Sequence, residues 1–319
     1  MKLKKLYELI ISCGIDADPR GPDAVRCDLK KTKELYEAAS AGEKTYFDKD
    51  RLWNPYDDSR LLHGRPEKDI KTLMAGIDID TSELLLIERL NDSPKKQKID
   101  LALSHHPQGC AFAGLSEVMD MQADIYHTLG VPVNVAEGLV ADRQKEISRR
   151  IHGANHHRAS SAARLLDIPF MCAHSPADNH AVSYLQGLLE RKKPGTVKEI
   201  MDILLGIEEY RESARGNTPP TLLFGRPQNR VGKIFVDMTG GTEGPKDIVD
   251  ALVSAGVGTI IGMHASEELF KKLQGKNINV IIAGHISSDS LGMNLLLDKI
   301  ERDASVTIRA CSGFTRVKR

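Results

Sequence analysis

Short apolar runs alternate with helical stretches from about residue 69 to the carboxyl terminus of this chain. In the first part the runs are KTLMAGIDI, IDLALS and IPFMCA; in the last third they are VGKIFVDM, GTIIGM and NVIIAG, with SVTIRAC closing the chain. Strands that alternate with helices are typical of βαβ units, in which a crossover helix returns the chain to a parallel strand. The sequence therefore predicts an α/β fold with mostly parallel sheets.

The segments between these runs predict the helices and the domain organisation. Helices are expected near residues 82–90, 116–129, 139–166, 179–190, 197–212, 246–254, 266–273 and 291–300, with a further short strand at 132–135. The stretch 192–195 is a predicted linker, and the region 216–232, rich in Gly, Pro and Asn, is a predicted boundary or surface loop. We expect a helical extension over 1–52, a first α/β portion over 53–195 and a second over 196–319.

The charge balance argues against partners that bind through bulk electrostatics. The 319 residues contain 44 basic and 44 acidic side chains, so the formal net charge at pH 7 is zero. A neutral chain has no long-range attraction to nucleic acid or to an anionic membrane. The segment closest to a basic stripe contains Arg143, Lys145, Arg149, Arg150, Arg158 and Arg164. Such a pattern is more typical of a solvated helix face than of an anion site.

Cysteine usage and hydropathy both favour the cytosol. The number of cysteines is odd and no CxxC pair occurs, which indicates a reducing compartment; they are Cys13, Cys27, Cys110, Cys172 and Cys311. No apolar run approaches the length of about 20 residues that spans a bilayer. The first residues, MKLKKLYELI, carry Glu8 within the apolar stretch, so they predict a short amphipathic helix rather than a signal peptide.

Three of the apolar runs stop at histidine. IDLALS is followed by His105 and His106, IPFMCA by His174, and NVIIAG by His285. In an open α/β sheet the carboxyl ends of the strands line the crevice where ligands bind, because the following helices splay apart there. Side chains from distant parts of the chain are therefore expected to converge at one edge.

Two of these histidines are accompanied by a carboxylate at the same offset. His174 precedes Asp178 by four residues, and His285 precedes Asp289 by four. Just beyond a strand, this offset places the acid in the first helical turn, where both groups face one ion. Neutral imidazole and carboxylate are the usual protein ligands for Zn, Mn and Fe, so the sequence predicts a divalent-metal site.

The number of candidate ligands favours a pair of ions. Six groups exceed what one tetrahedral ion requires, whereas two ions that share a carboxylate need about this number; the six are His105, His106, His174, Asp178, His285 and Asp289. Structural hydrogen bonding at a strand end is the simpler interpretation of any one histidine alone. Four histidines and two acids at corresponding strand ends favour the metal site.

These motifs resemble those of the NIF-three-like family, the NGG-one-interacting factor group whose members often carry the label GTP cyclohydrolase type 1, type 2 homologue. SHHP at 104–107 matches its paired-histidine motif, HSPAD at 174–178 looks like its His-three-residues-Asp motif, and GHISSD at 284–289 resembles a motif that ordinarily ends in glutamate. DDSRLLHGRPEKDIKTLMAGIDI resembles the acidic loop and first strand of the family, which ends near Asp78. The resemblance runs from about residue 57 to residue 300.

The resemblance implies two α/β lobes with two metal ions between them, and assembly as a toroidal homohexamer. Asp289 stands where the family usually has glutamate, and its shorter side chain makes it the least secure of the six ligands. The first fifty residues have no family counterpart, and DNHA, beginning at Asp178, replaces a continuation that usually contains glycine. Substrate preference does not carry over across these changes.

Further histidines have two interpretations each. His264 follows GTIIGM and is a candidate acid or base in the same crevice, or equally a polar cap on the next helix. His180 is a candidate substitute ligand, although a surface or supporting role is simpler. His152 and His156 are four residues apart, with His157 beside them, and predict a shared helical face. The segment lacks the glutamate of a zincin helix, which argues against a second metal site. We expect instead a helix face near the cleft, where Arg149 or Arg158 can contact an anionic substrate.

Two other features offer weaker signals. The loop TGGTEGP at 239–245 links a strand to a helix, with Pro245 suited to the first helical position; its backbone N–H groups can bind phosphate, but a tight turn is the simpler interpretation. It lacks the Gly-Lys-Ser/Thr ending of a P-loop. Cys110 has no activating signature and no GxSxG elbow occurs, so nucleophilic catalysis is not indicated.

Together these features predict a hydrolase that depends on two divalent ions and acts on a small phosphorylated or nucleotide-like molecule. Two ions would polarise the substrate and lower the pKa of bound water. The alternative is a non-enzymatic protein for metal handling or for regulatory interaction, because no clear general acid accompanies the ligands.

Overall fold

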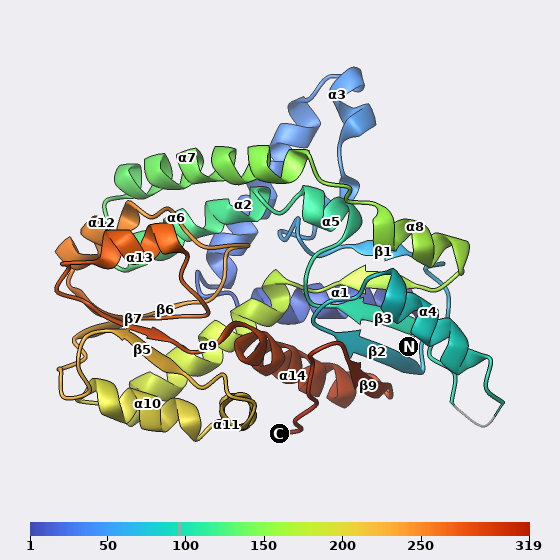
Figure 1. Cartoon of the computed structure of the whole chain (residues 1–319). Coiled ribbons are helices and arrows are strands. Elements are labelled where there is room, and N and C mark those ends of the chain that lie inside the picture. Colours follow the sequence, from blue (N-terminus) through green and yellow to red (C-terminus); the bar gives the residue numbers. More distant parts are fainter. Residues whose placement is uncertain (95–96) are drawn as a thin grey trace.

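The computed structural model describes residues 1–94 and 97–319, which form two sheets (Figure 1). The first sheet has the order β1-β4-β3-β2-β9 and contains β1 (Leu61–His63), β2 (Thr72–Gly76), β3 (Leu101–Ser104), β4 (Phe170–Cys172) and β9 (Thr307–Cys311). The second has the order β5-β8-β7-β6 and contains β5 (Thr221–Phe224), β6 (Lys233–Asp237), β7 (Val257–Gly262) and β8 (Asn279–Ile282). All neighbouring strands are parallel except the edge strands β1 and β5, so the predicted α/β fold is confirmed.

The helices fall into four groups along the chain. The first residues form α1 (Leu3–Asp16), α2 (Pro22–Ala38), α3 (Ala41–Tyr46) and the 3-10 helix η1 (Lys49–Leu52). Between the strands of the first sheet lie α4 (Thr81–Asn91), α5 (Gly109–Ala113), η2 (Glu117–Met119), α6 (Asp120–Thr128), α7 (Val133–His152) and α8 (Arg158–Leu165). The connection to the second sheet contains α9 (Ser175–Lys192), α10 (Val197–Leu205) and α11 (Glu208–Arg215). The remainder are α12 (Ile248–Ser254), α13 (Glu267–Leu273) and α14 (His285–Asp303).

Several predicted elements were wrong in kind or length. The predicted strand at 132–135 is the start of α7, because Pro132 caps the helix and Val133 and Val135 lie on its exposed side. The predicted helices at 139–166 and 197–212 are each two helices, interrupted near Gly153 and Gly206. The edge strand β5 lies inside the predicted loop at 216–232; its half-exposed residues give no buried apolar run.

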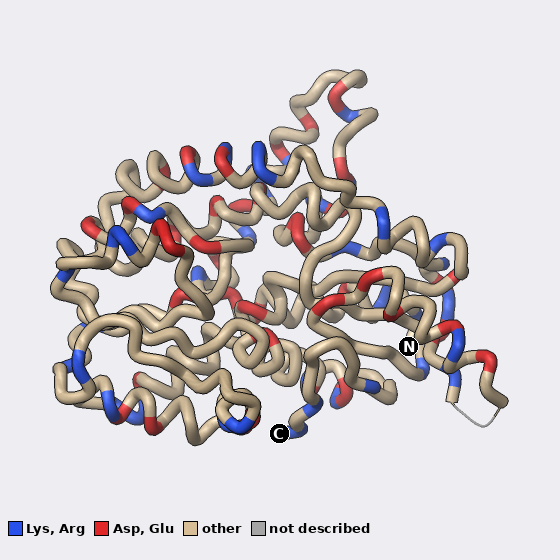
Figure 2. Tube along the Cα trace, viewed as in Figure 1, with Lys and Arg blue, Asp and Glu red and all other residues tan. Residues whose placement is uncertain are grey.

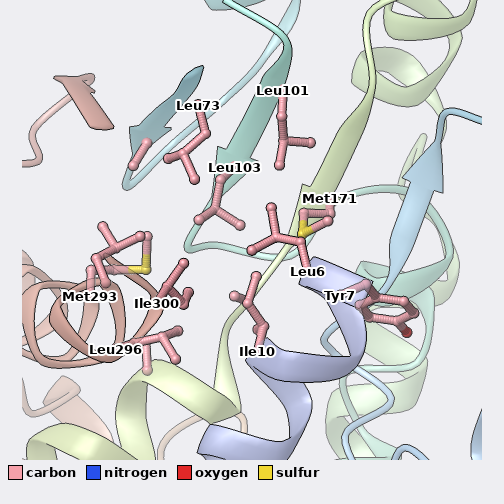
Figure 3. Close-up of a cluster of buried hydrophobic side chains, with 14 of the residues drawn as sticks. Leu6, Tyr7, Ile10, Leu73, Leu101, Leu103, Met171, Met293, Leu296 and Ile300 are labelled. Atoms are coloured by element: carbon pink, nitrogen blue, oxygen red, sulfur yellow. The ribbon is translucent and has the colours of Figure 1, made fainter. Parts of the chain in front are cut away.

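The two ends of the chain both contribute to the first sheet and its core. Strand β9 pairs with β2 over five residues, so the end of the predicted second portion, 196–319, belongs to the first sheet. The predicted helical extension over 1–52 is helical, but α1 is part of the core. Leu6 and Ile10 of α1 pack with Leu103 and Met171 of the sheet (Figure 3).

Helices α9 and α14 link the two lobes, one built around the first sheet and the other around the second, by crossing between them. Helix α9 follows a strand of the first sheet but packs Leu185 and Leu189 into the core beside the second sheet. Helix α14 follows a strand of the second sheet but packs Leu296 and Ile300 into the core of the first (Figure 3). The first turn of α9 meets α14 at Gly292, two turns into that helix, where an added Cβ would overlap the carbonyl oxygen of Ala177. This close contact holds the start of α9 against the first half of α14.

The charged side chains are distributed without a stripe of one sign, and both signs alternate along α7 (Figure 2). The basic residues between 143 and 158 that approach a stripe in the sequence are largely paired: Arg143 and Arg150 with Glu146, Lys145 with Asp142, and Arg158 with Asp80. This agrees with a solvated helix face. Among the described residues, no helix combines the length and the apolar character needed to cross a membrane.

Candidate metal centre

The carboxyl ends of strands from both sheets meet where α9 and α14 begin. His105 and His106 directly follow β3, His174 is the residue before α9, and His285 is the first residue of α14. Asp178 and Asp289 lie one turn into these two helices. The structure brings all six predicted ligand residues into one cluster, although they come from three separate segments of the chain.

Asp289 lies at the centre of this cluster. Its Oδ1 is 3.4 Å from Nε2 of His105, and its Oδ2 is 3.3 Å from Nε2 of His106 and 3.6 Å from Nε2 of His285. The side chain is fully buried. The sequence made Asp289 the least secure ligand because it is one methylene shorter than glutamate. In the structure it is the carboxylate with the most imidazole neighbours, because the start of α14 lies close to β3.

The ring orientations direct Nε2 of all four histidines toward the carboxylates of the cluster. Nδ1 of His105 donates to the carbonyl oxygen of Ala173 at 3.3 Å, which leaves its Nε2 facing Asp178 and Asp289. Nδ1 of His106 lies 2.7 Å from Oδ1 of Asp78. Such partners on the outer nitrogen fix the tautomer and orientation of a metal-binding imidazole.

Asp58 orients His174 in the same way. Asp58 was not identified as a functional residue in the sequence analysis. Its Oδ2 lies 2.8 Å from Nδ1 of His174 and accepts from Oγ of Ser175 at 2.7 Å. Asp58 is completely buried, and despite that burial its hydrogen bond with His174 lowers its pKa. The only signal in the sequence was its place in the acidic segment DDSR, which gives no indication of a partner 116 residues away.

Unsatisfied buried atoms test whether the cluster fits a cation. Within the described part of the chain, Nε2 of His105, Oδ1 of Asp178 and both carboxylate oxygens of Asp289 are buried without a hydrogen-bond partner. Buried polar atoms in native proteins are normally satisfied, so these four atoms call for a ligand. Two overlapping groups have ligand atoms within 4.8 Å of one another: His105, His174 and Asp178, and His105, His106 and Asp289. The donor set of imidazole and carboxylate suits a divalent metal.

The pKa values show how the cluster is charged without a metal. Burial lowers the pKa of His105 to about 4, so this imidazole is neutral and its lone pair is free near pH 7. Burial opposes protonation of His174, but Asp178 and Asp58 raise its pKa to about 9. Burial disfavours the ionised form of the Asp178 carboxyl and raises its pKa well above its usual range. The cluster therefore retains protons near neutrality that a bound cation would displace.

A cavity of about 460 Å³ opens beside the cluster. It is lined by His106, His174, Asp178 and His285 of the cluster. The ends of β6 and β7 and the loops that follow them add Asp237, Met238, Thr239, Glu243 and His264. Phe112 and Leu115 add an apolar surface, and Asn155 and Arg158 add polar groups. The volume is within the range of small-molecule sites, and the mixture of apolar lining with a few polar groups is typical of them.

The other histidines considered in the sequence analysis lie in different surroundings. The exposed His264 lines the cavity, and its ring centroid lies 5.0 Å from that of His285. His180 is buried, with Nδ1 donating to the carbonyl oxygen of Pro176, and belongs to neither ligand group. His152 ends α7 and His156 lies beyond it, so the predicted shared helical face was wrong. Gly153 ends the helix between them.

The loop at 239–245 lines the cavity but does not start a helix at Pro245, because α12 begins at Ile248. Nε2 of Gln122 donates to the carbonyl oxygens of Gly240 and Thr242, and both Gly240 and Gly241 have positive φ. The tight-turn interpretation is thereby favoured over a phosphate loop. Burial raises the pKa of Cys110, which agrees with the expectation that it is not an activated nucleophile.

We expect Asp58→Asn to weaken metal binding by about 10–100-fold, the effect typical of removing a partner that orients a metal-binding histidine. The neutral amide can still accept one hydrogen bond, but it no longer stabilises the imidazole electrostatically. Isothermal titration with Zn²⁺ or Mn²⁺ measures the change, and Asp69→Asn, at an exposed position near the amino terminus, is the matched control. Equal affinities for the two variants would contradict this role for Asp58.

Comparison with solved structures shows where this architecture occurs. A NIF3 superfamily protein from Sphaerobacter thermophilus matches with a TM-score of 0.70 at 28% sequence identity, covering 81% of this chain and 91% of that chain. Reduced HcgD from Methanocaldococcus jannaschii matches with a TM-score of 0.52 at 15% identity, covering 87% of this chain and 96% of that chain; at that identity the likeness concerns the fold alone. No protein-family model and no curated protein matches the sequence.

Proposed function

Since this chain is a NIF3-like α/β protein, we propose that it is a metal-dependent hydrolase that holds two divalent ions and acts on a small phosphorylated or nucleotide-like molecule. The observation that carries the proposal is the position of the cluster. Six candidate ligand groups lie together, and four of their buried atoms have no hydrogen-bond partner among the described residues. Four of the six groups line a cavity large enough for such a molecule.

The two overlapping groups of ligand atoms support a pair of ions. His105, His174 and Asp178 would hold one ion, and His106 and His285 the other. Asp289, whose oxygens lie 3.3–3.6 Å from Nε2 atoms of both sets, would serve both. Bound divalent ions supply Lewis acidity to a phosphoryl oxygen and lower the pKa of water. Zn, Mn and Fe all suit this donor set.

The residues of the chain would orient and enclose the substrate. Phe112 and Leu115 would exclude water from part of the cavity, and Asn155 and Arg158 would offer hydrogen-bond donors to its contents. Arg158 is exposed and paired with Asp80, so it can exchange that carboxylate for an anionic group of the substrate. The exposed imidazole of His264 lies within the same cavity, where it can accept or donate a hydrogen bond.

A substrate screen tests the proposal directly. The purified protein, loaded with Zn²⁺, Mn²⁺ or Fe²⁺, is assayed against phosphoesters, cyclic nucleotides and nucleoside triphosphates. We expect turnover that disappears with chelation and in His105→Ala, and that survives in His127→Ala, whose ring binds the carbonyl oxygen of Val131 outside the cavity. Stoichiometric metal without turnover on any of these substrates would instead favour a metal-handling or regulatory protein.

Assembly and location stay predictions. A homohexamer, implied by the family resemblance, would have six times the chain mass of 35.2 kDa, which light scattering measures. A cytosolic location is supported by the five free cysteines. Fractionation of cells that express the protein at its natural level tests it.

A further inference from the structure

The carboxyl group of Asp237 lines the cavity and has no role in the metal cluster. Asp237 ends β6 and lines the cavity from the second lobe, whereas His106, His174, Asp178 and His285 line it from the side of the cluster. A molecule bound in this cavity can therefore contact both the cluster and Asp237. This position suits a group that acts on the substrate without binding the ions.

The surroundings of Asp237 leave its carboxyl without a fixed partner. In residues 1–94 and 97–319, no side chain forms an ion pair with it or donates a hydrogen bond to it. Its acidic neighbour Glu243 is already engaged, because its two oxygens accept from the N–H and Oγ of Ser266 at 2.8 and 2.6 Å, with Arg143 at 4.0 Å. Tyr126 of α6 and His264 after β7 are the other titratable groups on this side.

The same surroundings favour a protonated carboxyl near neutral pH. Burial and the negative charge of Glu243 raise the pKa of Asp237 to about 7. A group whose pKa lies near the working pH is present in both forms and can give up and regain a proton in each cycle. Aspartate at its ordinary pKa would be ionised and could not donate.

We propose that Asp237 donates a proton to the leaving oxygen of the substrate, and that the natural substrates are phosphoesters of weakly acidic alcohols. This inference rests on the proposed hydrolase function. A water oxygen bonds to phosphorus, the bond between phosphorus and the ester oxygen breaks, and the carboxyl proton of Asp237 passes to that oxygen to release the alcohol. The water releases a proton to solvent, and Asp237 regains one from solvent.

The substrate class follows from the need for a donor. An alkoxide is a poor leaving group unless it is protonated as the bond breaks, whereas the anion of an acidic phenol leaves without help. General acid catalysis contributes typically 10²–10⁴-fold. A proton donor in the same cavity as the ions therefore increases the rate for alkyl esters, including sugar and nucleoside phosphates, and has little effect on activated aryl esters.

Two esters and two variants test the assignment. Asp237→Asn and the control Asp250→Asn, at an exposed position of α12, are loaded with metal and assayed on an alkyl phosphoester and on 4-nitrophenyl phosphate. We expect Asp237→Asn to lose about 10²–10⁴-fold on the alkyl ester and less than tenfold on the aryl ester, with unchanged metal stoichiometry. An equal loss on both esters, or no loss on either, would overturn the assignment. If the wild-type protein hydrolyses neither ester, the proposed function itself fails.

A spectroscopic measurement reads the same group without turnover. In metal-free protein, infrared difference spectra between Asp237→Asn and wild type isolate the carboxyl C=O band of Asp237, which we expect to titrate near pH 7. Glu243→Gln removes the neighbouring negative charge and should move that titration to lower pH. A band already absent at pH 5 would show an ordinary, ionised aspartate and refute the donor role.

Discussion

Asp289→Asn is expected to lower metal affinity by more than about 100-fold, beyond the range for residues that only orient a ligand. Its carboxylate oxygens lie 3.3–3.6 Å from Nε2 atoms of three histidines, so one substitution weakens the attachment of both proposed ions. The imidazoles also hold the pKa of Asp289 far below its ordinary range despite its burial, which keeps the carboxylate ionised and ready to bind. Asparagine has nearly the same shape but carries no charge.

Elemental analysis of the purified variants, followed by titration with Zn²⁺, measures this effect. Asp303→Asn, at the exposed end of the same helix, is the matched control and should bind metal like the wild type. Far-ultraviolet circular dichroism checks that both variants are folded. Full stoichiometry at wild-type affinity in Asp289→Asn would rule out Asp289 as a ligand, and the dinuclear proposal would lose the group that joins its two halves.

Gly292→Ala is expected to destabilise the fold by about 1–3 kcal/mol, the usual cost of overpacking a core. A Cβ on Gly292 would overlap the carbonyl oxygen of Ala177, which is backbone and cannot rotate away. The first turn of α9 and the first half of α14 must then separate. Because Ala177 directly precedes Asp178, and Asp289 lies three residues before Gly292, the same separation should also weaken metal binding.

The free energy of unfolding in urea measures the first effect, and zinc titration measures the second. Gly138→Ala on α7 is the control, because its Cβ would meet no atom within 4 Å. Alanine is favoured over glycine in a helix by about 1 kcal/mol, so this variant should be more stable than the wild type. If Gly292→Ala were as stable as Gly138→Ala, α9 and α14 would not be in the close contact described.

The sequence was sufficient for the fold class and for the candidate ligands because both depend on local pattern. Buried parallel strands have to be apolar, and a chain that turns out of a strand exposes its next residues at the carboxyl edge. Histidine at that position, followed four residues later by aspartate, is therefore readable from 174–178 and 285–289 alone. The half-exposed edge strand β5 escaped the same reasoning, since its apolar run, LLF, is short and lies in a segment rich in Gly, Pro and Asn.

What the sequence could not provide were contacts between segments distant in the chain. The pairing of β9 with β2, the contact of Asp58 with His174 and the central place of Asp289 each depend on how α9 and α14 cross between the sheets. The raised pKa of Asp237 likewise arises from burial and from Glu243 in the folded loop, not from the residue type. Local sequence determined which side chains stand at strand ends; the packing of two helices, which sums many weak contacts across the chain, decided which of them meet.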